Sequence, residues 1–446
     1  MDSLTIAGTI LLFIILMALE IPIGFALLGA GLVGIWGLGF GASTLSFMAA
    51  TPFGTTANYA MLIIPMFLLL GAIVAHSGIA TRIFEAANRL LGWLPGGLAV
   101  STILACTMFG AISGSSAADV ATIGKVSLKE MRRHGYNARF AAGVIAAGGT
   151  LAILIPPSVP MVMYGILTGV PIGPLLIAGI VPGLLTALAF IAYVVGVCWW
   201  RGIGVADIKM ALPSTSSVGR LRRAMSNPYV GLGYASVLIF TIIGGIYSGI
   251  FTSTEAAAFG AFVALLLGVP VSIAEGPGWR GMLGAALVEA GQLTSMVFIL
   301  LVGSAVFSYF LTLSGVAAAM ASWVIALDLS PNQVVALCLL ILIPLGMFLD
   351  GMSMLLIVVP LMYPLLKQLG VDGIWFGVLT IMLIEIGLLT PPFGINVFVI
   401  CGIAGDLSLE QAFIGVIPFM VIQFLMVLLI FFFPEIVLFL PSLAGP

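Results

Sequence analysis

Apolar stretches long enough to cross a membrane recur along the whole chain, and they restrict its possible folds more than any other feature. Residues 253–273 and 411–440 are two of them. A helix that spans a bilayer needs about 20 apolar residues, because it rises about 1.5 Å per residue through a hydrocarbon layer about 30 Å thick. Charged residues make up only 7% of the chain, whereas soluble domains carry about 25%. We therefore predict an all-α polytopic membrane protein.

The charge balance and the N-terminus narrow the class further. The net charge of −2 is too small to indicate a nucleic-acid-binding protein. The four cysteines lie in apolar segments without metal-ligand spacing and are expected to be buried apolar residues: Cys106, Cys198, Cys338 and Cys401. The N-terminal stretch MDSLTIAGTILLFIILMALE lacks the basic region and cleavage pattern of a signal peptide. We expect a retained first helix with a cytoplasmic N-terminus, followed by residues 41–58 on the outside.

The two halves of the chain repeat each other at a nearly constant spacing. The stretch Ser77–Ala80 corresponds to Ser314–Ala317, and Leu154–Pro157 corresponds to Leu389–Pro392. Each half is expected to contain helices, a short amphipathic arm, a pair of short segments and a helix broken by Pro-Pro. The predicted boundaries are residues 1–200 for the first repeat, 201–250 for a basic linker with a connecting helix, and 251–446 for the second repeat.

Basic residues are distributed as expected for two repeats of opposite orientation in the membrane. Seven lysines and arginines lie between residues 82 and 139, whereas the corresponding window 319–376 contains only Lys367. Basic loops stay on the cytoplasmic side, so corresponding loops fall on opposite faces. Residues 96–132 are then expected to form a re-entrant hairpin that enters from the cytoplasm, and residues 332–370 one that enters from outside.

The tips of these hairpins carry residues that can bind an ion. The first tip, Ser113–Ser116, reads SGSS, in which glycine permits a tight turn and the serines offer hydroxyl oxygens. A helix also begins there, so its free N–H groups and positive dipole end can face an anion. Small residues can instead serve helix packing. The corresponding stretch Asp350–Ser353 of the second half favours the functional interpretation.

Three carboxylates fall at membrane depth: Asp119, Asp350 and Glu385. A charge at the centre of a membrane helix costs about 2.5–3.5 kcal/mol on insertion scales, so such residues are candidates for function. They could balance a bound cation or exchange a proton. The alternative is a neutral carboxylic acid that hydrogen-bonds to the backbone.

Two Pro-Pro pairs interrupt long apolar segments in corresponding places. Pro156 and Pro157 break the predicted helix 138–170, and Pro391 and Pro392 break 374–404. Proline removes a helical hydrogen bond, and lipid offers no water to replace it. A single break could be a kink. Broken helices at matching positions of two halves are the pattern that indicates a transporter binding site.

These patterns predict two sodium sites and a substrate site between the tips, with no catalytic residue, no cofactor and no metal other than sodium. The first predicted sodium site comprises Ser113, Gly114, Ser115, Ser116, Asp119, Gly149, Thr150, Pro156 and Ser158. The second comprises Asp350, Gly351, Ser353, Glu385, Thr390, Pro391 and Asn396. The expected substrate contacts are Ser115, Ser116, Ser353, Pro157 and Pro392.

An enzyme is less well supported by the sequence. The two histidines, His76 and His134, lie far from either tip, and no G-x-S-x-G surrounds the tip serines. Gly124-Lys125 lacks the other residues of a P-loop, so nothing indicates ATP hydrolysis. A channel remains an alternative, but hairpins from opposite faces suit alternating access better.

Four motifs at these spacings resemble the large membrane subunit of TRAP (tripartite ATP-independent periplasmic) transporters over essentially the whole chain. They are MFGAISGSSAADVATIG, GGTLAILIPPSVPMVMYG, GMFLDGMSMLLIVVP and LLTPPFGINVFVI. The resemblance implies a multi-pass protein of the bacterial inner membrane that imports organic acids, such as C4-dicarboxylates or sialic acids, with sodium as the coupling ion. It also implies an elevator mechanism, in which hairpins and broken helices move as a transport domain past a scaffold.

The same resemblance implies two partner proteins. One is a small membrane subunit of about four helices, expected here as a separate chain, and the other is a periplasmic substrate-binding protein. A stand-alone sodium–dicarboxylate symporter of the same superfamily is the alternative, although such proteins typically carry Ser-Asn-Thr at their tips, which this sequence lacks.

Overall fold

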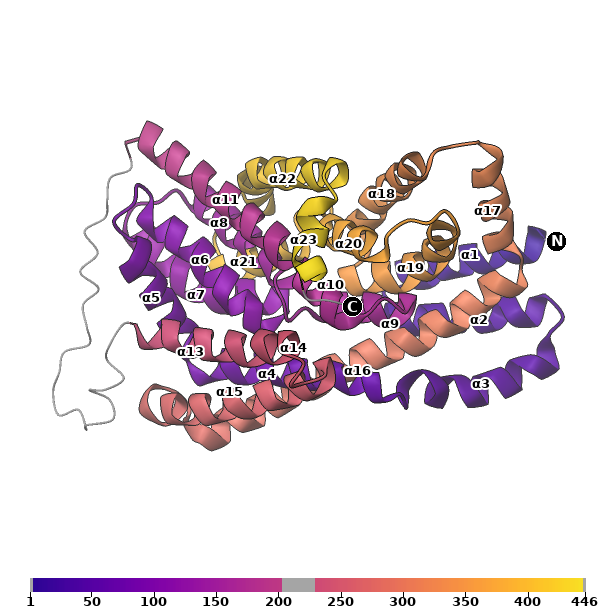
Figure 1. The fold of residues 1–446 in the computed structure, drawn as a ribbon, viewed down its shortest axis with the longest axis horizontal. Coiled ribbons are helices and arrows are strands. Elements are labelled where there is room, and N and C mark those ends of the chain that lie inside the picture. The colour runs from indigo at the N-terminus through magenta and orange to yellow at the C-terminus, as the bar shows by residue number, and fades with distance from the viewer. Residues whose placement is uncertain (1–2, 203–228, 444–446) are drawn as a thin grey trace.

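The computed structural model describes residues 3–202 and 229–443, and the regular elements in these ranges are all helices (Figure 1). The larger part of the predicted basic linker, residues 203–228, lies outside the described residues. Eight helical stretches within the described ranges are long and apolar enough to cross a membrane.

The first half contains helices of very different lengths. They are α1 (Ser3–Ala18), α2 (Ile23–Gly37), α3 (Gly41–Thr56), η1 (Tyr59–Leu62), α4 (Ile63–Ser77), α5 (Ile79–Leu91), α6 (Gly97–Ser113), α7 (Ser116–Arg133), α8 (Ala138–Thr150), η2 (Leu151–Ile153), α9 (Val159–Thr168), α10 (Ile172–Ala178) and α11 (Ile180–Trp200).

The second half follows a similar order of long and short helices. They are α13 (Val230–Ile239), the π-helix η3 (Phe240–Gly244), α14 (Gly245–Tyr247), α15 (Ser253–Glu275), α16 (Gly278–Leu313), α17 (Val316–Ala326), α18 (Pro331–Phe348), α19 (Gly351–Gln368), α20 (Gly373–Gly387), α21 (Ile395–Ala404), α22 (Leu409–Phe432) and α23 (Glu435–Leu443).

The N-terminal segment is a hairpin of two short helices, where the sequence indicated one helix. The chain reverses after α1 at Glu20, which has a φ of +61°, so that α2 runs antiparallel to α1. A methyl group added to Gly34 would lie 2.8 Å from a side-chain carbon of Thr9, and one added to Gly37 would lie equally close to Thr5. The N-terminus therefore lies on the same side as the segment that leads into α3.

This reversal corrects the predicted topology. A cytoplasmic N-terminus and an outside location for residues 41–58 cannot both hold, because both ends of the hairpin lie on one side. The physical reason is the sequence Glu-Ile-Pro at residues 20–22. The left-handed Glu20 turns the chain, and Pro22 stands at the N-cap of the helix that begins at Ile23, where its missing N–H breaks no helical hydrogen bond.

Helices α2, α4, α15 and α16 form one layer of the molecule, along the lower part of Figure 1, in which the other three all pack against α16. Helix α2 lies so close to α16 that a methyl group on Gly303 would sit 2.1 Å from the carbonyl oxygen of Gly24. Such glycine contacts are how membrane helices approach closely without a hydrophobic driving force between them.

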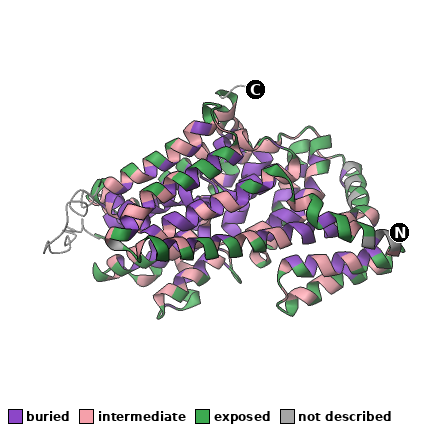
Figure 2. Ribbon diagram, turned by 90° about the horizontal axis from the view of Figure 1, so that it is seen from below, coloured by how far each residue is buried: buried purple, intermediate pink, exposed green. Residues whose placement is uncertain are grey.

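The most completely buried helices are α6, α8 and α20, and α4 of this layer is also largely buried. Nearly every residue of α6 and α8 is buried, whereas α1 and α13 expose much of their surface. Figure 2 shows the buried residues gathered in the middle of the molecule and the exposed ones on its outer helices. The hairpins and broken helices are unequally enclosed: α6, α8 and α20 are almost entirely buried, whereas most residues of α18 and α21 are only partly buried or exposed.

Candidate functional site

The first hairpin turns at a glycine in the left-handed conformation. Helices α6 and α7 pack against each other and are joined by Gly114 and Ser115. Gly114 has a φ of +61°, which strains any residue with a side chain. The Ser115 hydroxyl accepts a hydrogen bond from the Ala118 N–H at 3.4 Å and so caps α7. The turn lies within Ser113–Ser116, where the sequence indicated the tip.

This tip rests on the first Pro-Pro break. A methyl group on Gly114 would lie 2.8 Å from the carbonyl oxygen of Pro157. The hydroxyl of Ser158 caps α9 by accepting from the Met161 N–H at 3.3 Å, and it also donates to the Ile153 carbonyl. Ser158 therefore satisfies one of the carbonyls that the prolines free, that of Ile153.

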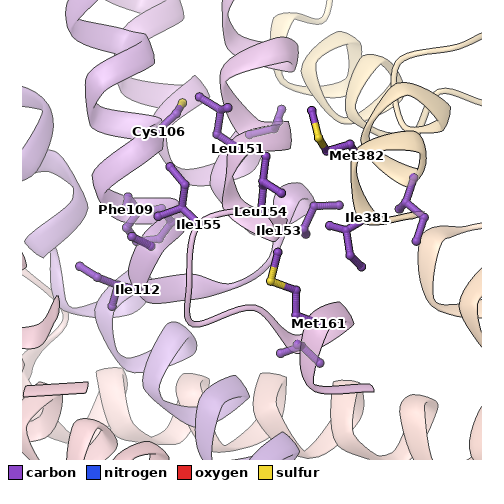
Figure 3. Close-up of a cluster of buried hydrophobic side chains, with 14 of the residues drawn as sticks. Cys106, Phe109, Ile112, Leu151, Ile153, Leu154, Ile155, Met161, Ile381 and Met382 are labelled. Atoms are coloured by element: carbon purple, nitrogen blue, oxygen red, sulfur yellow. The ribbon is translucent and has the colours of Figure 1, made fainter. Parts of the chain in front are cut away.

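The remainder of this break is packed in apolar side chains. Every residue from Leu151 to Ser158 is buried. Figure 3 shows Leu151, Leu154 and Ile155 close to Cys106 and Phe109 of α6. Just before the break, Gly149 faces α7, because a methyl group there would meet the Val120 side chain at 2.3 Å. Thr150 donates to the Ala147 carbonyl at 2.8 Å, within its own helix.

The second hairpin turns at an aspartate instead of a glycine. Asp350 caps α19 by accepting hydrogen bonds from the N–H groups of Met352 at 3.0 Å and Ser353 at 3.2 Å, and also from the Ser353 hydroxyl. Gly351 packs against Ile384 of α20. The carboxylate that the sequence singled out thus holds the tip of its own hairpin together.

The second break is more open than the first. Pro391, Pro392 and Phe393 are exposed, and the Phe393 ring lies 6.3 Å from the ring of Phe348, which precedes the second tip. Thr390 donates to the Ile386 carbonyl at 2.6 Å. Each tip therefore lies next to the break of its own half.

Asn396 departs from the predicted grouping. The sequence assigned it to the second sodium site, but its side chain is buried beside the first tip, where its amide N–H donates to the Ser116 hydroxyl at 2.7 Å and to the Ala146 carbonyl at 3.0 Å. The Ser116 hydroxyl also lies 3.0 Å from the amide oxygen. The assignment to the second site is corrected here: Asn396 links the first hairpin to α8.

The physical reason is that the two broken helices cross. The half-helix after the second break, α21, packs against α7 and α8, whereas the half-helix after the first break, α9, packs against α19. Each hairpin therefore contacts residues from both halves of the chain. At the far end of α21, Arg132 of α7 forms an ion pair with Asp406 at 2.7 Å, which ties the same two elements together again.

Asp119 lies in the first turn of α7 and is completely buried. Neither of its carboxylate oxygens has a hydrogen-bond partner among the described residues. The Cys106 thiol of α6 lies beside it. A charge in such a place costs about 2.5–3.5 kcal/mol when nothing balances it. The side chain therefore needs a bound proton or cation.

Glu385 also departs from the prediction. Its neighbours Ile384 and Gly387 face the second hairpin, but Glu385 itself faces α22 and accepts a hydrogen bond from the Gln423 amide. Successive residues of a helix point about 100° apart, which follows from 3.6 residues per turn, so Glu385 turns away from the tip. Its predicted place in the second sodium site is corrected accordingly. Gln423 was not singled out from the sequence, although a polar residue within an apolar helix is a usable signal.

The predicted substrate contacts differ in accessibility. Ser116, Ser353 and Pro157 are buried, Ser115 is partly exposed, and Pro392 is exposed. The groups that can reach a ligand without rearrangement therefore lie at Ser115 on the first tip and along the second break.

Comparison with known proteins identifies a transporter class. A family model described as "Tripartite ATP-independent periplasmic transporter, DctM component" matches residues 10–436. The C4-dicarboxylate TRAP transporter large permease protein of Pseudomonas aeruginosa is 36% identical over 410 residues, which cover 91% of this chain and 92% of that protein. The sialic acid TRAP transporter large permease protein of Vibrio cholerae is 33% identical over 436 residues, which cover 98% of both.

The fold has a relative among solved structures. A crystal structure of the YdaH transporter of Alcanivorax borkumensis superposes with a TM-score of 0.59 and covers 91% of this chain and 89% of that one. The sequence identity is 15%, so this likeness concerns the fold.

Proposed function

The chain belongs to the DctM family, the large membrane components of TRAP transporters, and on that premise we propose that it is a sodium-coupled importer of small organic acids. It is a multi-pass membrane protein whose relatives are transporter permeases. Two of those relatives carry C4-dicarboxylate and sialic acid in their names, which supports a carboxylate as the substrate class.

The observation that carries the proposal is the pair of hairpin tips that each lie against a broken helix. Non-helical backbone at membrane depth is tolerated where protein or a water-filled cavity covers it. Here Gly114 contacts the first break and Phe348 contacts the second. Freed carbonyls and helix ends at such breaks are what a transporter uses to bind ions and substrates.

The first sodium site is proposed at the first tip. Sodium, like other hard cations, takes oxygen ligands. The Ser113 hydroxyl, the backbone of Gly114 and the carbonyls around Pro156 supply them, and the unpartnered carboxylate of Asp119 supplies the charge. Ser116 has a different role in this proposal, because its hydroxyl is engaged by Asn396.

The second sodium site is proposed at the second tip, with a different set of donors. The Thr390 hydroxyl and the carbonyls before Pro391 lie on the break, and Asp350 and Ser353 lie on the tip. Because Asp350 already caps α19, it would lend charge to the site while it keeps its backbone hydrogen bonds.

The substrate is proposed to bind between the two tips. Helix α7 begins at the first tip and α19 begins at the second. The N-terminus of each helix carries a partial positive charge, which favours a carboxylate. Ser115 is partly exposed at the first tip, and Pro392 is exposed on the second break. These two positions give the substrate polar and apolar contacts from opposite halves of the chain.

Partners follow from the tripartite family. We propose a small membrane subunit as a separate chain and a periplasmic substrate-binding protein that delivers the organic acid, with this chain in the bacterial inner membrane. We propose that the N-terminus lies outside together with residues 38–41, because α1 and α2 are antiparallel. A cysteine at Ser3 should react with a membrane-impermeant maleimide in intact spheroplasts. Reaction only after lysis would contradict this topology.

The proposed movement is an elevator in which two inverted repeats contribute hairpins and broken helices to a transport domain. Leu176 of α10 and Ile243 of η3 line one small apolar cavity between the first break and the π-helical segment. A cross-link between cysteines at these two positions should stop uptake, and reduction should restore it. Full uptake in the cross-linked protein would exclude movement across this contact.

Uptake by reconstituted protein tests the proposal as a whole. The chain is placed in liposomes with its small subunit, and binding protein and radiolabelled C4-dicarboxylate or sialic acid are added outside. We expect accumulation only with inward sodium. Accumulation that is indifferent to sodium would contradict the coupling, and accumulation without the binding protein would favour the stand-alone symporter.

A further inference from the structure

Glu385 and Gln423 form an isolated polar pair within the apolar interior. Glu385 lies on α20 and Gln423 on α22, and both side chains are fully buried. The Gln423 amide nitrogen donates to one carboxylate oxygen of Glu385. The other carboxylate oxygen and the amide oxygen are both buried without a partner among the described residues.

These two unpartnered oxygens are unusual, because buried acceptors normally find a donor. Both belong to one hydrogen-bonded pair, and both are acceptors that lack a hydrogen-bond donor. A carboxylic acid and a primary amide can satisfy each other completely through two hydrogen bonds, in which the amide N–H and the acid O–H each donate once. One proton on Glu385 would therefore give partners to both oxygens.

No counter-charge replaces that proton. The titratable groups on the elements packed against α20 are Tyr164 on α9, Cys338 on α18, Tyr363 and Lys367 on α19, Glu410 on α22 and Glu435 on α23. Among the described residues, none of these forms an ion pair or hydrogen bond with Glu385. The pair also lies off the second tip, because Glu385 faces α22.

We propose that Glu385 and Gln423 form a proton-binding site, in which Glu385 is a neutral acid that donates to the Gln423 amide oxygen. The bound proton closes a two-bond link between the half-helix before the second break and α22. It also removes a charge that would otherwise be buried without compensation in the apolar interior. This site is separate from the proposed sodium sites and does not depend on the coupling ion.

Infrared spectroscopy of the purified chain in detergent tests this directly. The difference between the wild-type and Glu385→Gln spectra should contain the C=O stretch of a protonated carboxylic acid, in mildly acidic and in mildly alkaline buffer alike. The matched control is Glu410→Gln on α22, the helix that carries Gln423. The Glu410 side chain is exposed, and the difference spectrum of this control should lack that band at alkaline pH. A carboxylate band in the Glu385→Gln difference spectrum would overturn the proposal.

Removing sodium from the buffer distinguishes a bound proton from a bound sodium ion at this site. The band should be unchanged when sodium chloride is replaced by choline chloride. A band that appears only without sodium would show a cation site and overturn the proposal. If Glu385→Gln does not fold, the swapped variant Glu385→Gln with Gln423→Glu keeps one acid and one amide, and it should retain the band and the wild-type Tm.

Discussion

Replacement of Gly114 by alanine should weaken sodium binding in addition to destabilising the fold. Gly114 is the turn residue of the first tip, with a φ of +61°. A methyl group there would lie 2.8 Å from the Pro157 carbonyl oxygen, whereas ordinary contacts begin at 3.4 Å, about 0.6 Å farther away. The first tip must therefore retreat from the first break, and the proposed sodium ligands lie on both.

Backbone strain and displacement of the tip both contribute to the effect of Gly114→Ala, and a control substitution at a second glycine separates the two. Left-handed strain on alanine costs about 1–2 kcal/mol. Gly169, between α9 and α10, has a φ of +74° and nothing within 4 Å of an added methyl group, so Gly169→Ala carries the strain alone. Binding geometry tolerates displacements of about 0.5 Å, and we expect Gly114→Ala to lose about tenfold in sodium affinity, or about 1.4 kcal/mol.

The assay is the sodium dependence of uptake in proteoliposomes, together with the Tm of each variant. Both variants should lower the Tm by similar amounts, and only Gly114→Ala should raise the sodium concentration needed for half-maximal uptake. Equal sodium dependence in the two variants would refute the reasoning that the tip and the first break share an ion.

The remaining predictions concern the contacts around the same tip. Ser116→Ala and Asn396→Ala should each destabilise the protein by about 1–3 kcal/mol, because each leaves buried partners unsatisfied, and denaturation of the double variant should show a loss smaller than the sum. Additive losses would contradict the contact. Asp119→Asn should raise the half-maximal sodium concentration by about tenfold or more, which a sodium titration of uptake measures, and an unchanged titration would exclude this carboxylate as the balancing charge. The hydrogen bond and charge of Arg132 lower the pKa of Asp406, so this ion pair stabilises the folded state at neutral pH and is lost as the pH falls through the lowered pKa. The Tm difference between wild type and Asp406→Asn should therefore shrink in acid, and a difference that is constant with pH would contradict it.

Local chemistry made the tips and breaks predictable. The pairs of adjacent prolines that begin at Pro156 and at Pro391 cannot continue a helix. Gly114, which lies between two serines, permits a sharp turn. The reversal after α1 was missed because it needs only the short stretch Glu20–Pro22 within a long apolar run. The one charged residue in that stretch, directly before Ile-Pro, was the available signal.

The partners of Asn396 and Glu385 could not be predicted in the same way. Asn396 meets Ser116 across 280 positions of sequence, and this contact depends on how the two broken helices cross, which no local pattern records. Helix α20 is buried nearly all round. Its apolar residues therefore have no periodicity that would tell which helix Glu385 faces.

The dependence of organic-acid uptake on the sodium gradient provides the most direct test of the central claim, that the paired tips and breaks couple an organic acid to sodium. The initial rate of uptake is measured in proteoliposomes with the small subunit and binding protein, at zero membrane potential, while the inward sodium gradient is varied. The account predicts that the rate and the final accumulation rise with the gradient and collapse when a sodium ionophore is added. Accumulation that persists with sodium equal on both sides, driven by a proton gradient alone, would contradict it.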